Sequence, residues 1–73
     1  MRKNVFTKKF DDKESLDEFI NNCVGEYHYY DIRPNNVNID GLNVTITMRC
    51  SRNFWCRKEI LENNGFAFEV KES

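Results

Sequence analysis

The sequence is poor in several residue types, and each shortage argues against a class of structure. Its 73 residues include one proline, three glycines, one histidine, one alanine and no glutamine. The glycines are scattered, so no phosphate-binding glycine loop is present. No stretch approaches the roughly 20 apolar residues of a membrane-spanning helix, and the basic residues 1–4 lead into a mixed segment rather than the apolar core of a signal peptide. We therefore expect a cytoplasmic protein.

Cysteine occurs three times, but its spacing indicates neither a disulfide framework nor a metal site. Cys23, Cys50 and Cys56 are odd in number, and the sequence contains no C-x-x-C pair and no H-x-x-x-H pair. We expect no metal and no cofactor. Cys23 is interpreted as a small core residue on a helix, and structural roles are also favoured for the other two cysteines, with Cys56 facing inward.

No complete catalytic motif is present, so an enzyme is the least favoured class. A nucleophilic pair would need Cys50 or Cys56 beside His28, and no spacing in the sequence brings them together. We interpret His28 as a half-buried strand residue. Neighbouring carboxylates such as Asp11-Asp12 lie where a helix starts, which is typical of a solvated surface rather than of an acid–base pair.

The composition indicates one folded domain, residues 1–73, with residues 1–3 and 71–73 frayed. Hydrophobic residues make up 40% of the chain and aromatic residues 14%, whereas disordered chains are poor in both. The 11 basic and 12 acidic residues nearly cancel, so binding to nucleic acid would need a local basic patch. Ten asparagines against one alanine and no glutamine favour an AT-rich gene, as in many phages and low-GC bacteria.

The clearest predicted element is an amphipathic helix over residues 12–24. Asp11 or Asp12 can cap its start, Glu14 is placed for a capping box with Asp11, and Gly25 is placed to end it. Its apolar residues follow the i, i+3, i+4, i+7, i+8 spacing of one helix face. They are Leu16, Phe19, Ile20, Cys23 and Val24.

Strands are predicted on both sides of this helix. Residues 4–10 form the first, and Asp40-Gly41 predicts a two-residue hairpin turn with Ile39 opposite Leu42. If this register continued to the residues before Val37, it would bury polar groups. We therefore expect a break at residues 34–36. The break returns three residues to the core side, namely His28, Tyr30 and Ile32. Alternatively, residues 26–33 form a separate strand.

A second helix is predicted over residues 53–63 and a last strand over residues 66–70. Ser51 or Asn53 caps the helix, and Asn64-Gly65 ends it. The resulting order, β-α-β-β-α-β, predicts an α+β domain with a small antiparallel sheet and both helices on one face. The ferredoxin-like split βαβ arrangement fits this order best.

One segment, residues 48–58, combines four basic residues with the only tryptophan. If the apolar stripe of the second helix includes Phe54, Cys56 and Leu61, Trp55 falls almost opposite it and is either exposed or packed from the preceding loop. Tryptophan and arginine are enriched at binding hot spots, and both suit stacking and phosphate contacts on nucleic acid. The candidate partner-binding residues are Arg49, Arg52, Trp55, Arg57 and Lys58, extended by Tyr27 and Tyr29.

These observations favour a non-enzymatic binding module that acts on a protein partner, as an inhibitor or modulator encoded by a phage or other mobile element. The alternative is a weak nucleic-acid binder that uses the same basic and aromatic patch. An exposed edge strand would also allow a homodimer by sheet extension. The protein-binding and nucleic-acid-binding hypotheses both compete with a simpler interpretation. In it, the basic cluster is a solvated face and Trp55 is part of the core.

Overall fold

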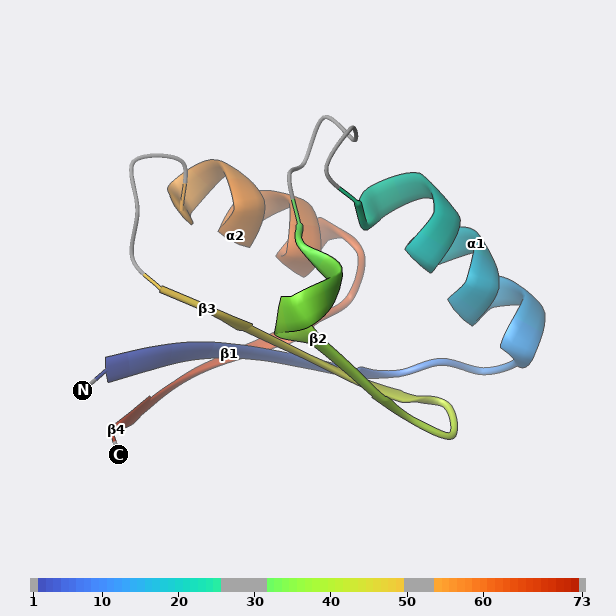
Figure 1. The fold of residues 1–73 in the computed structure, drawn as a ribbon, viewed down its shortest axis with the longest axis horizontal. Helices are drawn as coiled ribbons and strands as arrows, with labels where there is room; N and C mark the ends of the chain where they lie inside the picture. Colours follow the sequence, from blue (N-terminus) through green and yellow to red (C-terminus); the bar gives the residue numbers. More distant parts are fainter. Residues whose placement is uncertain (1, 26–31, 50–53, 73) are drawn as a thin grey trace.

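The computed structural model describes residues 2–25, 32–49 and 54–72 (Figure 1). It confirms the α+β class and the order β-α-β-β-α-β within those residues. A 3₁₀ turn, η1, precedes the second strand. The elements are β1 (Arg2–Lys9), α1 (Lys13–Cys23), η1 (Pro34–Asn36), β2 (Val37–Asp40), β3 (Asn43–Met48), α2 (Phe54–Asn63) and β4 (Ala67–Glu72).

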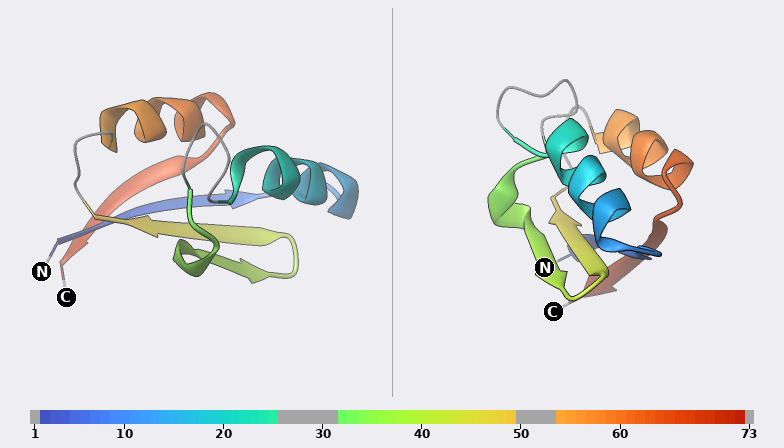
Figure 2. Two further views of the ribbon diagram at one scale, coloured as in Figure 1. Left: turned by 45° about the horizontal axis from the view of Figure 1, so that its top comes forward. Right: turned by 90° about the vertical axis from the view of Figure 1, so that its right-hand side faces the viewer.

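The four strands form one antiparallel sheet in the order β2-β3-β1-β4. Because β1 and β2 both run antiparallel to β3, they point the same way with β3 between them. Both helices lie on one face, with α2 towards β4, and within the described ranges the other face carries no helix (Figure 2). The β1–β4 pairing includes Arg2 with Glu72 and Lys3 with Lys71, and so extends into the ends for which the sequence predicts fraying.

The start of α1 is fixed by Asp12, one of the two caps that the sequence predicts. The Ser15 backbone N–H donates to Asp12 Oδ1 at 2.8 Å, and this hydrogen bond lowers the pKa of the Asp12 carboxyl. Since the cap is Asp12 rather than Asp11, a capping box with Glu14 does not form. The helix ends before Gly25, as predicted.

The hairpin forms, but its turn lies one residue later than the sequence predicts. The turn residues are 41 and 42, and Ile39 pairs with Val44 instead of Leu42. The glycine takes a φ of +62°, and Leu42 packs against the core from the turn. The Leu42 carbonyl also accepts a hydrogen bond from the Phe10 N–H at 2.8 Å. Because the register moves by two residues, every side chain keeps its face.

The predicted break at Pro34–Asn36 is present as η1, and β2 begins directly after it. Ile32 is buried in the core, as expected. Its carbonyl accepts from the Gly25 N–H at 2.8 Å, which ties the end of α1 to the segment before η1. His28 and Tyr30, and most of the alternative strand over 26–33, lie outside the described residues.

The end of α2 follows from Asn64-Gly65, as predicted. Gly65 has a φ of +89°, its N–H donates to the Glu62 carbonyl, and the Phe66 N–H donates to the Leu61 carbonyl. This pair of bonds is the Schellman motif, in which buried Leu61 and Phe66 bracket the turn. The predicted caps at Ser51 and Asn53 lie outside the described residues.

The prediction for the buried face of α2 is wrong at Cys56, which is exposed. Phe54 and Leu61, seven residues apart and so about two turns, define the buried side. At about 100° per residue, Cys56 lies some 200° away from Phe54. The Cys56 thiol therefore faces solvent. The prediction failed because it placed Phe54 and Cys56, two residues apart, on the same face of a helix.

The core lies between the sheet and the two helices. Aromatic rings dominate it: Phe6 stacks on Phe68 with centroids 4.9 Å apart, and Phe19 lies 5.1 Å from Phe66. Cys23 is buried among them, as predicted, and burial raises the pKa of its thiol. The cluster comprises Phe6, Phe10, Leu16, Phe19, Cys23, Ile32, Val44, Ile46, Met48, Phe54, Leu61 and Phe66.

Candidate functional site

The predicted binding residues divide into two surfaces. Trp55 and Lys58 lie on the side of α2 that faces the β4 edge. Arg49 and Arg57 line a cleft between η1, the end of β3 and α2. The remaining candidates, Tyr27, Tyr29 and Arg52, lie outside the described residues.

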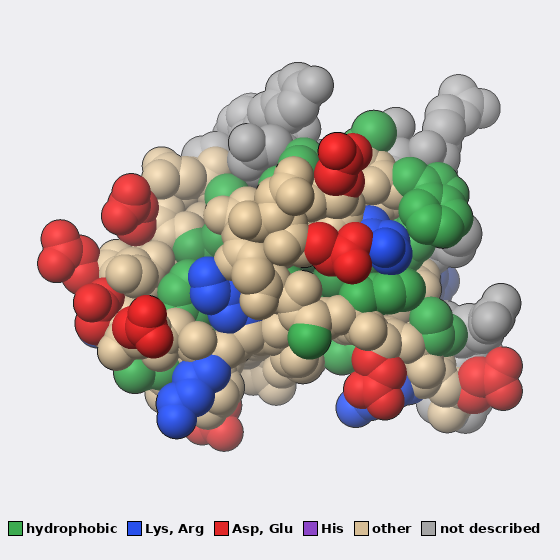
Figure 3. Space-filling view, turned by 180° about the vertical axis from the view of Figure 1, so that it is seen from behind, with side chains coloured by type: hydrophobic (Ala, Val, Ile, Leu, Met, Phe, Trp, Pro, Cys, Tyr) green, Lys and Arg blue, Asp and Glu red, His purple; other side chains and the backbone are tan. Residues whose placement is uncertain are grey.

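The first surface, here called the α2–β4 surface, consists of Trp55, Lys58, Phe68 and Val70. Trp55 is 70% exposed and Val70 42% exposed. The Lys58 ammonium lies 5.8 Å from the Trp55 ring centroid and 5.0 Å from that of Phe68, so its stem bridges the helix and the strand. Figure 3 views the molecule from the β4 side, where hydrophobic side chains reach the surface among acidic and basic ones.

The chain geometry places Trp55 above the second half of β4. The helix α2 and the strand β4 extend to the same side of the turn at Gly65, with opposite chain directions (Figure 1). Counting back to Trp55 gives ten residues, or about 15 Å of helix, and counting forward to Val70 gives five, or about 17 Å of strand. Trp55 and Val70 are therefore level with each other along the sheet edge.

Charges within the α2–β4 surface are internally paired. Lys58 Nζ lies 2.7 Å from Glu62 Oε1, one turn further along α2. A lysine held both by a carboxylate and over two aromatic rings is oriented along the helix face. The Lys58 ammonium is thus paired with Glu62, and the most exposed side chain of the surface is Trp55.

The strand β4 is an edge of the sheet, since β1 is its only partner among the described strands. Its outer row of backbone N–H and C=O groups is consequently not used in the sheet. Phe68 and Val70 lie on the helix side of β4, as their pairing with Phe6 and Asn4 shows. An added strand would find open hydrogen-bonding groups with apolar side chains beside them.

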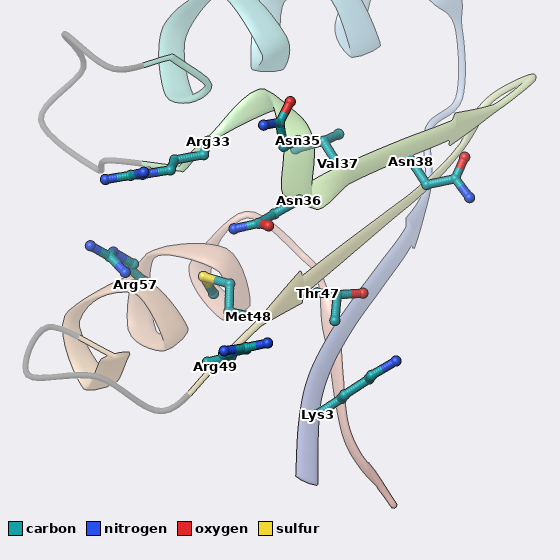
Figure 4. A pocket seen from close by; sticks show the side chains of 10 residues that line it. All are labelled: Lys3, Arg33, Asn35, Asn36, Val37, Asn38, Thr47, Met48, Arg49 and Arg57. Atoms are coloured by element: carbon teal, nitrogen blue, oxygen red, sulfur yellow. The ribbon is translucent and has the colours of Figure 1, made fainter. Parts of the chain in front are cut away.

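The second surface, here called the basic cleft, has a volume of about 640 Å³ and is shown in Figure 4. Among the residues that the structure describes, ten line it, of which four are basic and none is acidic. Arg33 and Arg57 extend from one side, Arg49 and Lys3 lie on the other, and Asn36 and Met48 lie between them (Figure 4). The remaining lining residues are Asn35, Val37, Asn38 and Thr47.

The cleft exists because β2 is shorter than β3. The pairing of β2 with β3 begins at Val37 opposite Ile46, whereas β3 continues to pair with β1 as far as Met48. Pro34 has no N–H to donate, and η1 turns the chain away from the sheet. A notch is left beside the last residues of β3, and η1 and α2 form its walls.

The open face of the sheet adjoins the cleft through Lys3 and Arg49. Side chains on this face are polar apart from Ala67 and Val5, and Val5 is buried although it lies outside the core cluster. Register and alternation place there Lys3, Val5, Thr7 and Lys9 of β1, Asn38 and Asp40 of β2, Asn43, Thr45 and Thr47 of β3, and Ala67, Glu69 and Lys71 of β4, with Arg49 following β3.

Sequence reasoning missed Lys3, Arg33 and Val70 as surface-forming residues. Lys3 lies far from Arg49 in sequence, and only the β1–β3 pairing brings their ends together. The sequence feature that pointed to Arg33 is the turn that follows it. A break in the strand beside β3 must leave part of β3 without a neighbouring strand. Val70 lies in the last strand that the sequence predicts, but the sequence does not say which strand is at an edge.

Among residues 2–25, 32–49 and 54–72, no group of three or more His, Cys, Asp or Glu side chains is placed to hold a metal ion. Within the same residues, no helix has the length and apolarity needed to cross a membrane. Comparison with protein-family models, with curated proteins and with solved structures gives no match.

Proposed function

We propose that this protein is a non-enzymatic binding module that recognises a protein partner through the α2–β4 surface. The observation that carries this proposal is Trp55, which is 70% exposed beside an open edge strand. Water contact over a large indole is unfavourable, by about 25 cal/mol per Å² of apolar area, and covering the ring recovers that free energy. Truncating a tryptophan at an interface hot spot typically costs 2 kcal/mol or more.

The partner contributes an extended segment that adds to β4 as a fifth strand. Main-chain hydrogen bonds to the outer row of β4 supply affinity, and alternate side chains of the segment meet the helix side of the sheet. There Phe68 and Val70 provide apolar side chains, and Lys58 lies over the rings of both Trp55 and Phe68. Such a module acts as an inhibitor or modulator by binding to its partner. Its amino-acid composition, which favours an AT-rich gene, supports a phage or mobile-element origin.

We also propose that the fold is the ferredoxin-like split βαβ arrangement. The support is the strand order β2-β3-β1-β4, with β3 inserted between β1 and β2. Both helices lie on the same face of this sheet. This arrangement leaves β2 and β4 as the two edges, and of these β4 has six residues and β2 four.

The test is selection of a displayed library of random peptides on the immobilised protein. Peptides with alternating apolar residues should be enriched, since a strand meets the helix side of the sheet with every second side chain. Their affinity should fall by tenfold or more in Trp55→Ala and in Val70→Lys. Ile39→Lys is the matched control, because Ile39 is 48% exposed on the opposite edge strand β2.

Two results would contradict the proposal. One is enrichment of the same peptides on the Trp55→Ala/Val70→Lys double variant, which shows that they bind elsewhere. The other is loss of binding in Ile39→Lys alone, which moves the site to the β2 edge. Sedimentation of the protein without peptide tests the homodimer: dimerisation abolished by Val70→Lys means that a second copy, not a different protein, occupies β4.

A further inference from the structure

The basic cleft brings together positively charged side chains from four separate segments of the chain. Lys3, Arg33 and Arg49 line it without an ion pair to any residue in the described ranges, and Arg57 adds a fourth cation from α2. Net charge for the chain is −1, so this accumulation is local. Cations grouped around a concave surface focus the field within it and attract anions.

The cleft also offers neutral hydrogen-bond donors. The amides of Asn35, Asn36 and Asn38 and the hydroxyl of Thr47 line it together with the cations. Arginine binds phosphate with two parallel N–H bonds, and amide and hydroxyl donors add to them. The two charged oxygens of a phosphodiester group can accept hydrogen bonds from such a donor set, and the group repeats along a nucleic-acid strand.

Basic residues continue from the cleft across the open sheet face. Lys3 and Arg49 belong to both, and Lys9 and Lys71 lie further along the same face, on β1 and β4. Acidic residues on that face are fewer, namely Asp40 and Glu69. A ligand that bears several phosphates in a row would contact the cleft and the face together.

We propose that the basic cleft binds the phosphodiester backbone of a single-stranded nucleic acid. The volume of about 640 Å³ is within the range of small-molecule sites, and a cleft of this size accommodates a short stretch of one strand. The described residues on the open face include no aromatic side chain for stacking, so recognition rests on the phosphates, which carry no base-sequence information. This site is separate from the α2–β4 surface and does not depend on the proposed function.

The experiment is fluorescence anisotropy with labelled oligo-dT and oligo-U, from about 50 to 200 mM salt. Arg33→Gln and Arg49→Gln should each weaken binding several-fold and reduce the log–log salt slope by about 0.7, because each removes one phosphate contact on a single strand. Both residues are exposed, so the variants should fold. Lys13→Gln is the matched control: it removes the same charge on α1, where Lys13 pairs with Asp17 at 2.9 Å, and should change neither quantity.

Competitors identify the chemistry. Unlabelled single strand should displace the probe, while polyglutamate and a duplex of equal length should displace it much less well. Equal competition by polyglutamate would overturn phosphate recognition, and equal competition by the duplex would overturn the single-strand assignment. Equal displacement by ATP at the same phosphate concentration would contradict the proposal that the cleft recognises a nucleic-acid strand. Absence of binding at low salt, or binding unchanged by both arginine variants, would overturn the site itself, whereas Trp55→Ala should leave binding intact.

Discussion

Single residues in this protein owe their chemistry to the side of a helix on which they lie. Cys23 and Cys56 are both helical, yet Cys23 is buried and Cys56 is exposed. Burial in the apolar core raises the pKa of the Cys23 thiol, since the thiolate loses its hydration there. One cysteine is thus a packing residue, and the other is available to reagents.

Alkylation with iodoacetamide near pH 8 should therefore modify Cys56 much faster than Cys23. The thiolate is the reacting species, and Cys23 has both less thiolate and less access. Peptide mapping by mass spectrometry after timed quenching reads each site separately, so Cys50 does not interfere. In denaturant the two rates should become similar. Equal rates in the native protein would show that α1 does not hold Cys23 in the core.

For Trp55, the sequence did not decide between exposure and burial. Periodicity allowed either an exposed ring or one packed from the preceding loop, and the structure shows the former. At about 100° per residue, Trp55 lies at right angles to the buried Phe54. It touches Phe54 only edge-on, with ring centroids 5.5 Å apart.

Elements in this fold begin and end where local chemistry dictates. Helix α1 starts at the residue whose carboxylate accepts the Ser15 N–H, and α2 ends where Gly65 adopts a positive φ. These boundaries were predictable because caps act within a few residues of sequence. The hairpin turn was misplaced by one residue because Leu42 packs against the core and bonds to Phe10, contacts that no local pattern contains.

The capping bond at Asp12 makes the stability of α1 depend on pH. The bond lowers the pKa of Asp12 below its usual 3.8, so its contribution is present above about pH 4 and is lost as the pH falls through the folded-state value. Asp12→Asn keeps a good cap that does not titrate. The free energy of unfolding of the wild type, measured relative to Asp12→Asn by urea denaturation, should therefore decrease below pH 4.

Two further variants control this measurement. Asp12→Ala should be less stable than both at pH 7, because the Ser15 N–H loses its acceptor. Asp11→Ala changes the neighbouring exposed carboxylate, which does not cap the helix, and should leave stability almost unchanged. A larger loss in Asp11→Ala than in Asp12→Ala would place the cap one residue earlier.

At the scale of the whole molecule, the sheet order creates both candidate surfaces. Placing β4 at one edge exposes its outer backbone beside Trp55, and ending β2 early leaves the notch beside β3. The class and element order follow from periodicity and turn residues. Neither surface does, because each combines residues that only strand pairing brings together, such as Lys3 with Arg49.

The two surfaces also differ in the physical basis of binding. Apolar area and open main-chain groups characterise the α2–β4 surface, so its interactions should respond weakly to salt. Positive charge characterises the basic cleft, whose interactions should weaken steeply as salt is added. The sequence grouped Trp55 with the arginines as one patch, whereas the helix separates Trp55 from Arg57.

The most direct test of the central claim uses the fluorescence of Trp55, the only tryptophan in the chain. In the free protein the ring is 70% exposed, so its emission should be that of a hydrated indole and acrylamide should quench it efficiently. Saturation with a library-selected peptide should shift the emission to shorter wavelength and reduce the quenching, while saturation with oligo-dT should change neither. A peptide that binds tightly and leaves both signals unchanged would show that Trp55 is not at the interface.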